Sequence, residues 1–93
     1  MAILRINDYQ AKPGVEEALH SALLAAVPVI ANLEGCRHVR LLSCLDDPAR
    51  YIIFEEWDSI EAHKKAAQAI PADMIAKVAS LLAGTPKGAF FRG

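Results

Sequence analysis

Strand-like and helix-like segments follow one another along this chain in an order that few folds accommodate. Strand segments show alternating apolar and polar residues or a run of β-branched and aromatic residues, whereas helix segments repeat apolar residues every three or four positions. The expected strands cover residues 2–10, 36–45, 50–57 and 87–92, and the expected helices cover residues 15–33, 59–69 and 71–84. The order is therefore strand, helix, strand, strand, a helical arm in two pieces, and strand.

Prolines and capping residues predict where these helices begin and end. Pro28 lies within the first helical segment and predicts that this helix kinks or ends early. Asp58 and Glu61 resemble a capping box, so the second helix is expected to begin near Ser59. Pro71 is expected to occupy the first turn of the last helix.

The order of the segments predicts the fold. The turn Asp46-Asp47-Pro48 is short enough to join the two middle strands as an antiparallel hairpin. Because strand–helix–strand crossovers are right-handed, the order reduces to an α+β, ferredoxin-like antiparallel sheet with helices on one face. Residues 1–93 are expected to form a single domain of this kind.

The apolar content is high for so short a chain. Apolar residues make up 54% of the sequence, and a chain of this length buries only about 60–65% of the surface that its unfolded form exposes. In the third expected strand, Ile52 and Phe54 share one face while Tyr51, Ile53 and Trp57 share the other, so neither face is polar. We expect a second copy of the chain to cover the face that has no helices, giving a homodimer.

Charge and residue spacing exclude several classes of protein. The net charge of −1, with Lys64-Lys65 as the only adjacent basic pair, argues against a nucleic-acid partner. Charges interrupt every apolar run, so no membrane partner is expected. Cys36 and Cys44 would lie ~26 Å apart on one extended strand, so both thiols are expected to stay reduced, which favours a cytoplasmic location. The three histidines lie far apart in sequence, so no metal site is expected.

Five short motifs, together with the elements between them, resemble a known family. They are Lys12-Pro13-Gly14, Glu34-Gly35-Cys36, Asp47-Pro48, Glu55-Glu56-Trp57-Asp58-Ser59 and Glu61-Ala62-His63. The chain is similar over nearly its whole length to the antibiotic biosynthesis monooxygenase family, within the dimeric α+β barrel superfamily. The resemblance implies a dimeric α+β barrel and a small oxygenase that acts on an electron-rich aromatic compound or a quinol without metal, flavin or other cofactor.

The mechanism that the resemblance implies assigns candidate catalytic roles to Asn7, Trp57 and His63. A deprotonated phenolic substrate can itself reduce dioxygen, so the protein needs a dry cavity, a proton acceptor and donors that stabilise the anion. Asn7 would donate to that anion, although an asparagine bonded to neighbouring backbone is the alternative. Trp57 would stack on a flat aromatic substrate or anchor the core, and His63 would accept a proton or simply face solvent.

Four further residues are candidates for substrate binding. Arg5 and Glu55 have the side-chain parity to lie inside with Asn7, either as a buried ion pair or with Arg5 binding an anion. Tyr9 and Tyr51 would hold a phenolic substrate or lie at the rim of the sheet.

Two other functions remain open from the sequence. A dimer that binds a small ligand without turnover, or one associated with stress, would keep the same motifs, because most of them form the fold. A haem-binding or haem-degrading relative would need an axial histidine about nine or ten positions after the tryptophan, where this chain has Ala66 and Ala67.

Overall fold

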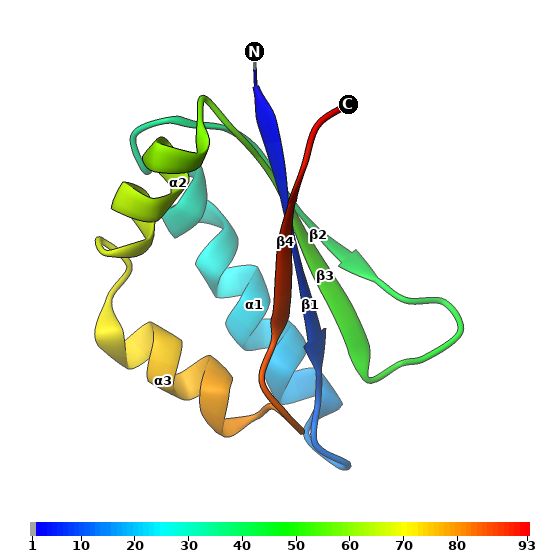
Figure 1. Cartoon of the computed structure of the whole chain (residues 1–93). Helices are drawn as coiled ribbons and strands as arrows, with labels where there is room; N and C mark the ends of the chain where they lie inside the picture. The colour runs from blue at the N-terminus through cyan, green and yellow to red at the C-terminus, as the bar shows by residue number, and fades with distance from the viewer. Residues whose placement is uncertain (1) are drawn as a thin grey trace.

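The computed structural model describes residues 2–93 and contains four strands and three helices (Figure 1). In chain order these are β1 (Ile3–Gln10), α1 (Glu16–Ala31), β2 (Cys36–Ser43), β3 (Arg50–Trp57), α2 (Ile60–Ala67), α3 (Ala72–Ser80) and β4 (Lys87–Phe91). The expected order of elements is confirmed, including the helical arm in two pieces.

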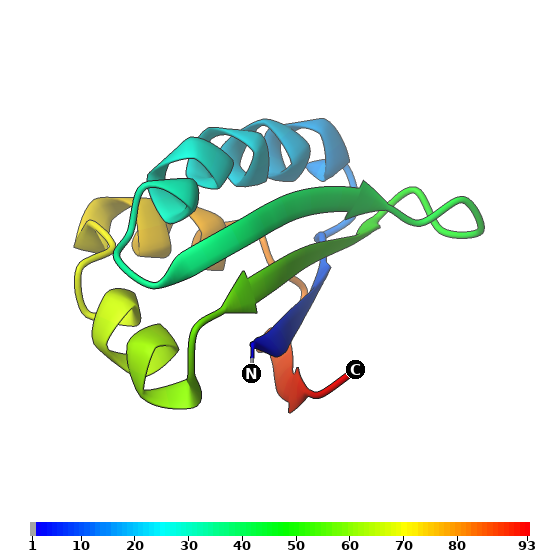
Figure 2. The ribbon, with the colours of Figure 1, turned by 90° about the horizontal axis from the view of Figure 1, so that it is seen from above.

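The strands form one antiparallel sheet in the order β2-β3-β1-β4, with all three helices on the same face (Figure 1). Seen from above, the opposite face of the sheet carries no helix (Figure 2). The α+β, ferredoxin-like fold expected from the sequence is therefore confirmed. In this sheet β1 lies between β3 and β4, and Arg5 pairs with Glu55 across β1 and β3.

Side chains of β3 alternate between the two faces of the sheet. Tyr51, Ile53, Glu55 and Trp57 are buried beneath the helices, because successive residues of a strand point to opposite sides. The largest fully buried side chains of the described chain are Trp57, Leu19, Leu23 and Ile53, so α1 and β3 supply the centre of the core. Glu55 is the one charged residue that is buried among residues 2–93.

The face without helices is apolar at its centre. Ile6, Ile52 and Phe54 lie next to one another there across β1 and β3, and each is partly exposed. At its edges Leu42 is 39% exposed and Phe91 is 49% exposed. No element of residues 2–93 covers this surface, which is the one for which the sequence predicts a second copy.

Helix α1 does not end early at Pro28. It continues to Ala31, because a proline near the C-terminal end of a helix removes only one backbone bond there. The side-chain amide of Asn32 donates to the carbonyl of Pro28 at 2.7 Å, which satisfies one carbonyl near the end of the helix. Of the two effects that Pro28 predicts, a kink or an early end, the early end does not occur.

Ser59, rather than Asp58, caps the start of α2. The Ser59 hydroxyl accepts from the backbone N–H of Ala62 at 3.0 Å. Asp58 instead forms an exposed ion pair with Arg37 at 2.6 Å. The expected capping box does not form, because the residue three positions after Ser59 is Ala62, which has no side-chain acceptor to bond back, while the predicted start of the helix is confirmed.

Candidate active site

A connected set of polar side chains lies between the sheet and the helices. The carboxylate of Glu55 accepts from the indole N–H of Trp57 at 2.7 Å and from the amide of Asn7 at 3.0 Å. The guanidinium of Arg5 in turn donates to the amide oxygen of Asn7 at 3.0 Å. These bonds fix the Asn7 amide, because its oxygen must face Arg5 while its nitrogen faces Glu55.

Asn7 takes the place of a direct ion pair between Arg5 and Glu55. The two charged residues are paired in register across β1 and β3, as the side-chain parity indicates. Within residues 2–93, however, no Arg5–Glu55 salt bridge forms, and the Asn7 amide connects the two groups. The guanidinium carbon of Arg5 lies 4.5 Å from the centre of the Phe90 ring, in a cation–π contact.

Gly88 on β4 makes room for this arrangement. A Cβ atom at Gly88 would lie 2.7 Å from the amide oxygen of Asn7 and would collide with the guanidinium of Arg5. The sequence analysis missed this residue. A glycine inside a strand was the available signal, since it commonly marks a place where other atoms approach the backbone closely.

The residue Glu55 is 4% exposed, and burial raises the pKa of its carboxyl group above the ordinary value. The hydrogen bond from Trp57, the positive charge of Arg5 and the hydrogen bond from Asn7 oppose this effect. Glu55 is thus a buried carboxyl group whose two oxygens are already occupied by protein donors. It orients its neighbours and leaves little of its own bonding capacity for a substrate.

His63 approaches this cluster from α2. Its side chain is 16% exposed, and Nε2 lies 3.9 Å from a carboxylate oxygen of Glu55. The ring packs edge-on against Trp57 and Phe90, with ring centres 5.4 and 5.2 Å apart. Its Nδ1 atom is buried and has no hydrogen-bond partner within the described chain.

Burial, with a contribution from the charge of Arg5, lowers the pKa of His63 below the ordinary value of a histidine. The imidazole is therefore neutral at neutral pH, and one of its nitrogens is available as a proton acceptor. An unpaired buried nitrogen is unfavourable in a folded protein, so His63 is the member of the cluster that most needs an external partner.

These side chains surround a small pocket of about 90 Å³. Its polar lining consists of Asn7, Tyr9, Glu55, Trp57 and His63, and its apolar lining consists of Ile30, Leu33, Ala67 and Ile70. The structure thus brings together five of the seven predicted site residues, and Arg5 is bonded to one of them. The apolar lining residues were not singled out in the sequence, where nothing distinguishes them from core residues.

Tyr51 lies outside this pocket. Its hydroxyl donates to the backbone carbonyl of Glu16 at 3.3 Å, and its ring stacks on His20 with centres 5.5 Å apart. Tyr51 shares a face with Glu55, but four residues of extended strand separate them by ~13 Å. The structure therefore gives Tyr51 a packing role against α1 rather than a place in the site.

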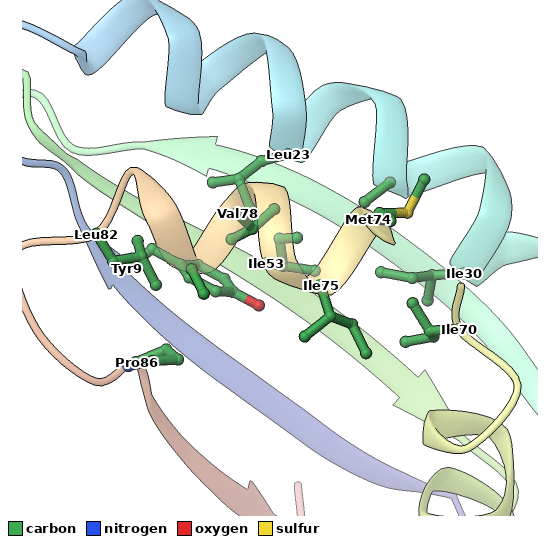
Figure 3. A pocket seen from close by; sticks show the side chains of 12 residues that line it. Tyr9, Leu23, Ile30, Ile53, Ile70, Met74, Ile75, Val78, Leu82 and Pro86 are labelled. Atoms are coloured by element: carbon green, nitrogen blue, oxygen red, sulfur yellow. The ribbon is translucent and has the colours of Figure 1, made fainter. Parts of the chain in front are cut away.

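A larger cavity of about 300 Å³ adjoins the polar pocket (Figure 3). Tyr9, Ile30 and Ile70 line both spaces, so the two are neighbours with a shared wall. The Tyr9 hydroxyl points into the larger cavity and has no hydrogen-bond partner among residues 2–93 (Figure 3). The site therefore has a polar end near His63 and an apolar end between α1 and α3.

The raised pKa of Tyr9 leads us to expect that the folded protein loses stability at alkaline pH. Burial, and then the negative charge of Glu55, raise the pKa of Tyr9 from 10.0 to about 12. A phenol that holds its proton more tightly in the folded state stabilises the fold below pH 10, and this contribution disappears as the pH rises toward 12. We expect the wild type to lose about 2–3 kcal/mol more than Tyr9→Phe between pH 9 and pH 12, measured by urea unfolding. Equal losses in the two proteins would contradict the buried phenol.

Other features of the described residues bear on ligands and environment. Cys36 and Cys44 are free thiols, as the sequence predicts. Within residues 2–93, no group of three or more histidine, cysteine, aspartate or glutamate side chains is placed to hold a metal ion. Over the same residues, no helix has both the length and the apolar character needed to cross a membrane.

Comparison with solved structures shows the same fold throughout the chain. A structure of Rv0793 from Mycobacterium tuberculosis is similar with a TM-score of 0.86 and 21% identity, over 100% of this chain and 95% of that one. A mutant of SnoaB, a cofactor-independent oxygenase from Streptomyces nogalater, is similar with a TM-score of 0.83 and 18% identity, over 99% of this chain and 92% of that one. A protein from Chloroflexus aurantiacus assigned to the antibiotic biosynthesis monooxygenases is 28% identical with a TM-score of 0.77, over 100% and 95% of the two chains.

Sequence comparison gives a family as well as a fold. The uncharacterized protein YczJ of Bacillus subtilis is 29% identical over 52 residues, which is 56% of this chain and 55% of that relative. The match thus spans about half the length of the curated relative. The family model described as antibiotic biosynthesis monooxygenase matches residues 2–70, which include every polar residue of the pocket. The chain belongs to the antibiotic biosynthesis monooxygenase family.

Proposed function

We propose that the protein is a cofactor-independent monooxygenase that oxidises a small electron-rich aromatic or quinol-type compound with dioxygen. The observation that carries this proposal is the unpartnered Nδ1 of a neutral, buried His63 beside a pocket with fixed donors. A base of this kind suits removal of a proton from a weakly acidic substrate near neutral pH.

The proposed reaction begins at a ring carbon that is a CH₂ group in the keto form of the phenol. His63 takes one proton, and the resulting anion gives one electron to dioxygen, forming a substrate radical and superoxide. These two combine into a carbon–oxygen bond, and the peroxide takes a proton back from His63. Loss of water, with the second hydrogen of the carbon leaving as a proton, produces a carbonyl group. One oxygen atom ends in the product and the other in water, and the substrate supplies all four electrons.

The protein side chains have distinct roles in this proposal. The Asn7 amide has a second N–H, beyond the one bonded to Glu55, that can donate to the substrate anion. Glu55 positions Asn7 and Trp57, and Trp57 forms a wall of the pocket. A substrate that fills the apolar cavity would displace water from it, which would strengthen the electrostatic interactions inside it.

A binding protein without turnover is the second candidate function. Asn7, Glu55 and Trp57 satisfy one another by hydrogen bonds, as side chains of a purely structural network would. In that case Asn7→Ala and His63→Ala would weaken ligand binding, whereas in an oxygenase they can lower the rate while affinity remains.

We also propose that the protein acts in the cytoplasm as a homodimer joined through the sheet face without helices. Ile6, Ile52 and Phe54 form the centre of that face and remain partly exposed in one copy. A face-to-face pair of sheets would remove this apolar surface from water.

Oxygen consumption tests the proposed function directly. We expect the protein to increase oxygen uptake from solutions of reduced naphthoquinols above the rate in buffer alone, with sedimentation showing a dimer at micromolar concentration. Absence of uptake with every electron-rich phenol tried, in a folded dimeric preparation, would contradict the oxygenase and favour the binding protein. A stable single copy in sedimentation would contradict the dimer.

A further inference from the structure

The cavity between α1 and α3 differs sharply in character from the polar pocket that it adjoins. Of its 12 lining residues in the described chain, Tyr9 alone carries a side-chain oxygen or nitrogen (Figure 3). The others are aliphatic residues, alanine, proline and one methionine, and they come from α1, α3, the sheet and the segments that follow α2 and α3. Any substrate group in this cavity would contact apolar side chains and the phenol of Tyr9.

The packing of α3 leaves an apolar space beside the core. None of the residues of α3 is fully buried, although Met74, Ile75 and Val78 form an apolar stripe that faces the cavity. Ile75 is 52% exposed. An amphipathic helix normally buries such a stripe against the core, whereas α3 lies over a space large enough for a small molecule.

The hydrogen-bonding groups of the combined site lie toward one end. The unpartnered hydroxyl of Tyr9 lies at the shared wall, and His63, whose buried Nδ1 has no partner among the described residues, lines the polar pocket beyond it. Apart from Tyr9, the residues that line the larger cavity, Leu23, Val78 and Ala79 among them, provide no donor or acceptor side chain. A polar substituent buried there would lose its water and find no replacement.

We propose that the substrate is a hydroxylated aromatic compound whose polar groups are confined to one end. That end binds beside Tyr9 and His63, and a hydrocarbon body without polar substituents fills the cavity between α1 and α3. This inference rests on the proposed function for the identity of the site, and it adds that aromatic compounds with hydroxyls at both ends are rejected. The cavity of about 300 Å³ lies at the lower end of the range for small-molecule sites, which suits a compound of two fused rings.

Calorimetric titration with three related compounds tests the inference without requiring turnover. The probes are naphthol, naphthalene, and a naphthalene diol with hydroxyls on opposite rings. We expect naphthol to bind tightest, the diol about 10- to 100-fold more weakly because its far hydroxyl is left unpaired, and naphthalene about 3- to 10-fold more weakly because it lacks the polar end. Tyr9→Phe is expected to reduce the preference for naphthol over naphthalene.

Substitutions of alanines on α1 test whether the apolar part of the bound compound lies in the cavity. Ala26 lines the cavity, and Ala26→Leu is expected to weaken naphthol binding at least 10-fold by filling it. Ala25 is exposed on the same helix and does not line the cavity, so Ala25→Leu is the matched control and should bind naphthol normally. Should Ala26→Leu not fold, Ala79→Leu, at an exposed position of α3 that lines the cavity, makes the same test.

The results separate this inference from the proposed function. Equal or tighter binding of the diol, or unchanged naphthol binding in a folded cavity-filling variant, would overturn the inference even if oxygen uptake occurs. Selective naphthol binding without oxygen uptake from any phenol would support the inference and contradict the proposed oxygenase activity.

Discussion

Replacing His63 with glutamine is expected to lower the rate of oxygen uptake at saturating substrate by about 10²–10⁴-fold. Glutamine keeps a polar side chain in the pocket but cannot accept a proton, so the first step of the proposed reaction loses its base. Substrate affinity should change only a few-fold, because the apolar cavity and Tyr9 remain. Initial rates over a range of substrate concentrations would separate kcat from KM.

His20→Gln is the control for this substitution. His20 stacks on Tyr51 at the other end of the helix-covered face and does not line either part of the site, so its replacement should leave the rate unchanged. The pH profile adds a second test. Because burial lowers the pKa of His63, the wild type should keep its activity as the pH falls to 6.5 and lose it only at lower pH. A folded His63→Gln protein with full activity would contradict the role of His63.

Gly35→Ala is expected to destabilise the fold by about 2–4 kcal/mol. Gly35 lies in the turn between α1 and β2 with a φ of 90°, a backbone conformation that residues with a Cβ rarely adopt. A Cβ at this position would also lie 2.8 Å from the Cβ of Ala62 on α2 and 3.7 Å from the ring of Trp57. The substitution therefore strains the backbone and pushes α2 away from the sheet. Urea unfolding at one fixed protein concentration measures the effect.

Gly14→Ala separates the two causes of this destabilisation. Gly14 has a similar φ of 88°, but nothing lies within 4 Å of the position of its Cβ. It should therefore show only the cost of the backbone conformation, about 1–2 kcal/mol. If Gly35→Ala were no worse than Gly14→Ala, the close contact between the turn and α2 would be refuted.

The periodicity of the sequence was sufficient to predict the sheet and the membership of its faces. Alternation along β1 places Arg5, Asn7 and Tyr9 on one face, and alternation along β3 places Glu55 and Trp57 on the corresponding face. Since a strand has only two faces and the crossover connections have one hand, these assignments follow from local pattern and chirality.

The same reasoning failed where position along a strand or detailed packing mattered. It grouped Tyr51 with the site because parity says nothing about distance along the strand, and Tyr51 lies against α1 instead. One of its two roles for Arg5, a direct pair with Glu55, does not form, because the Asn7 amide fits between the two groups and Gly88 admits the guanidinium, and the sequence pattern shows neither.

The amino-acid order alone thus established the strand and helix sequence, the ferredoxin-like topology and the resemblance to a family of oxygenases, because all three depend on local patterns and short motifs. The orphaned nitrogen of His63 and the apolar cavity under α3 appeared only in the folded molecule. The unpartnered nitrogen and the cavity both depend on the distance of α2 and α3 from the sheet. That distance results from the packing of side chains that are far apart in the sequence.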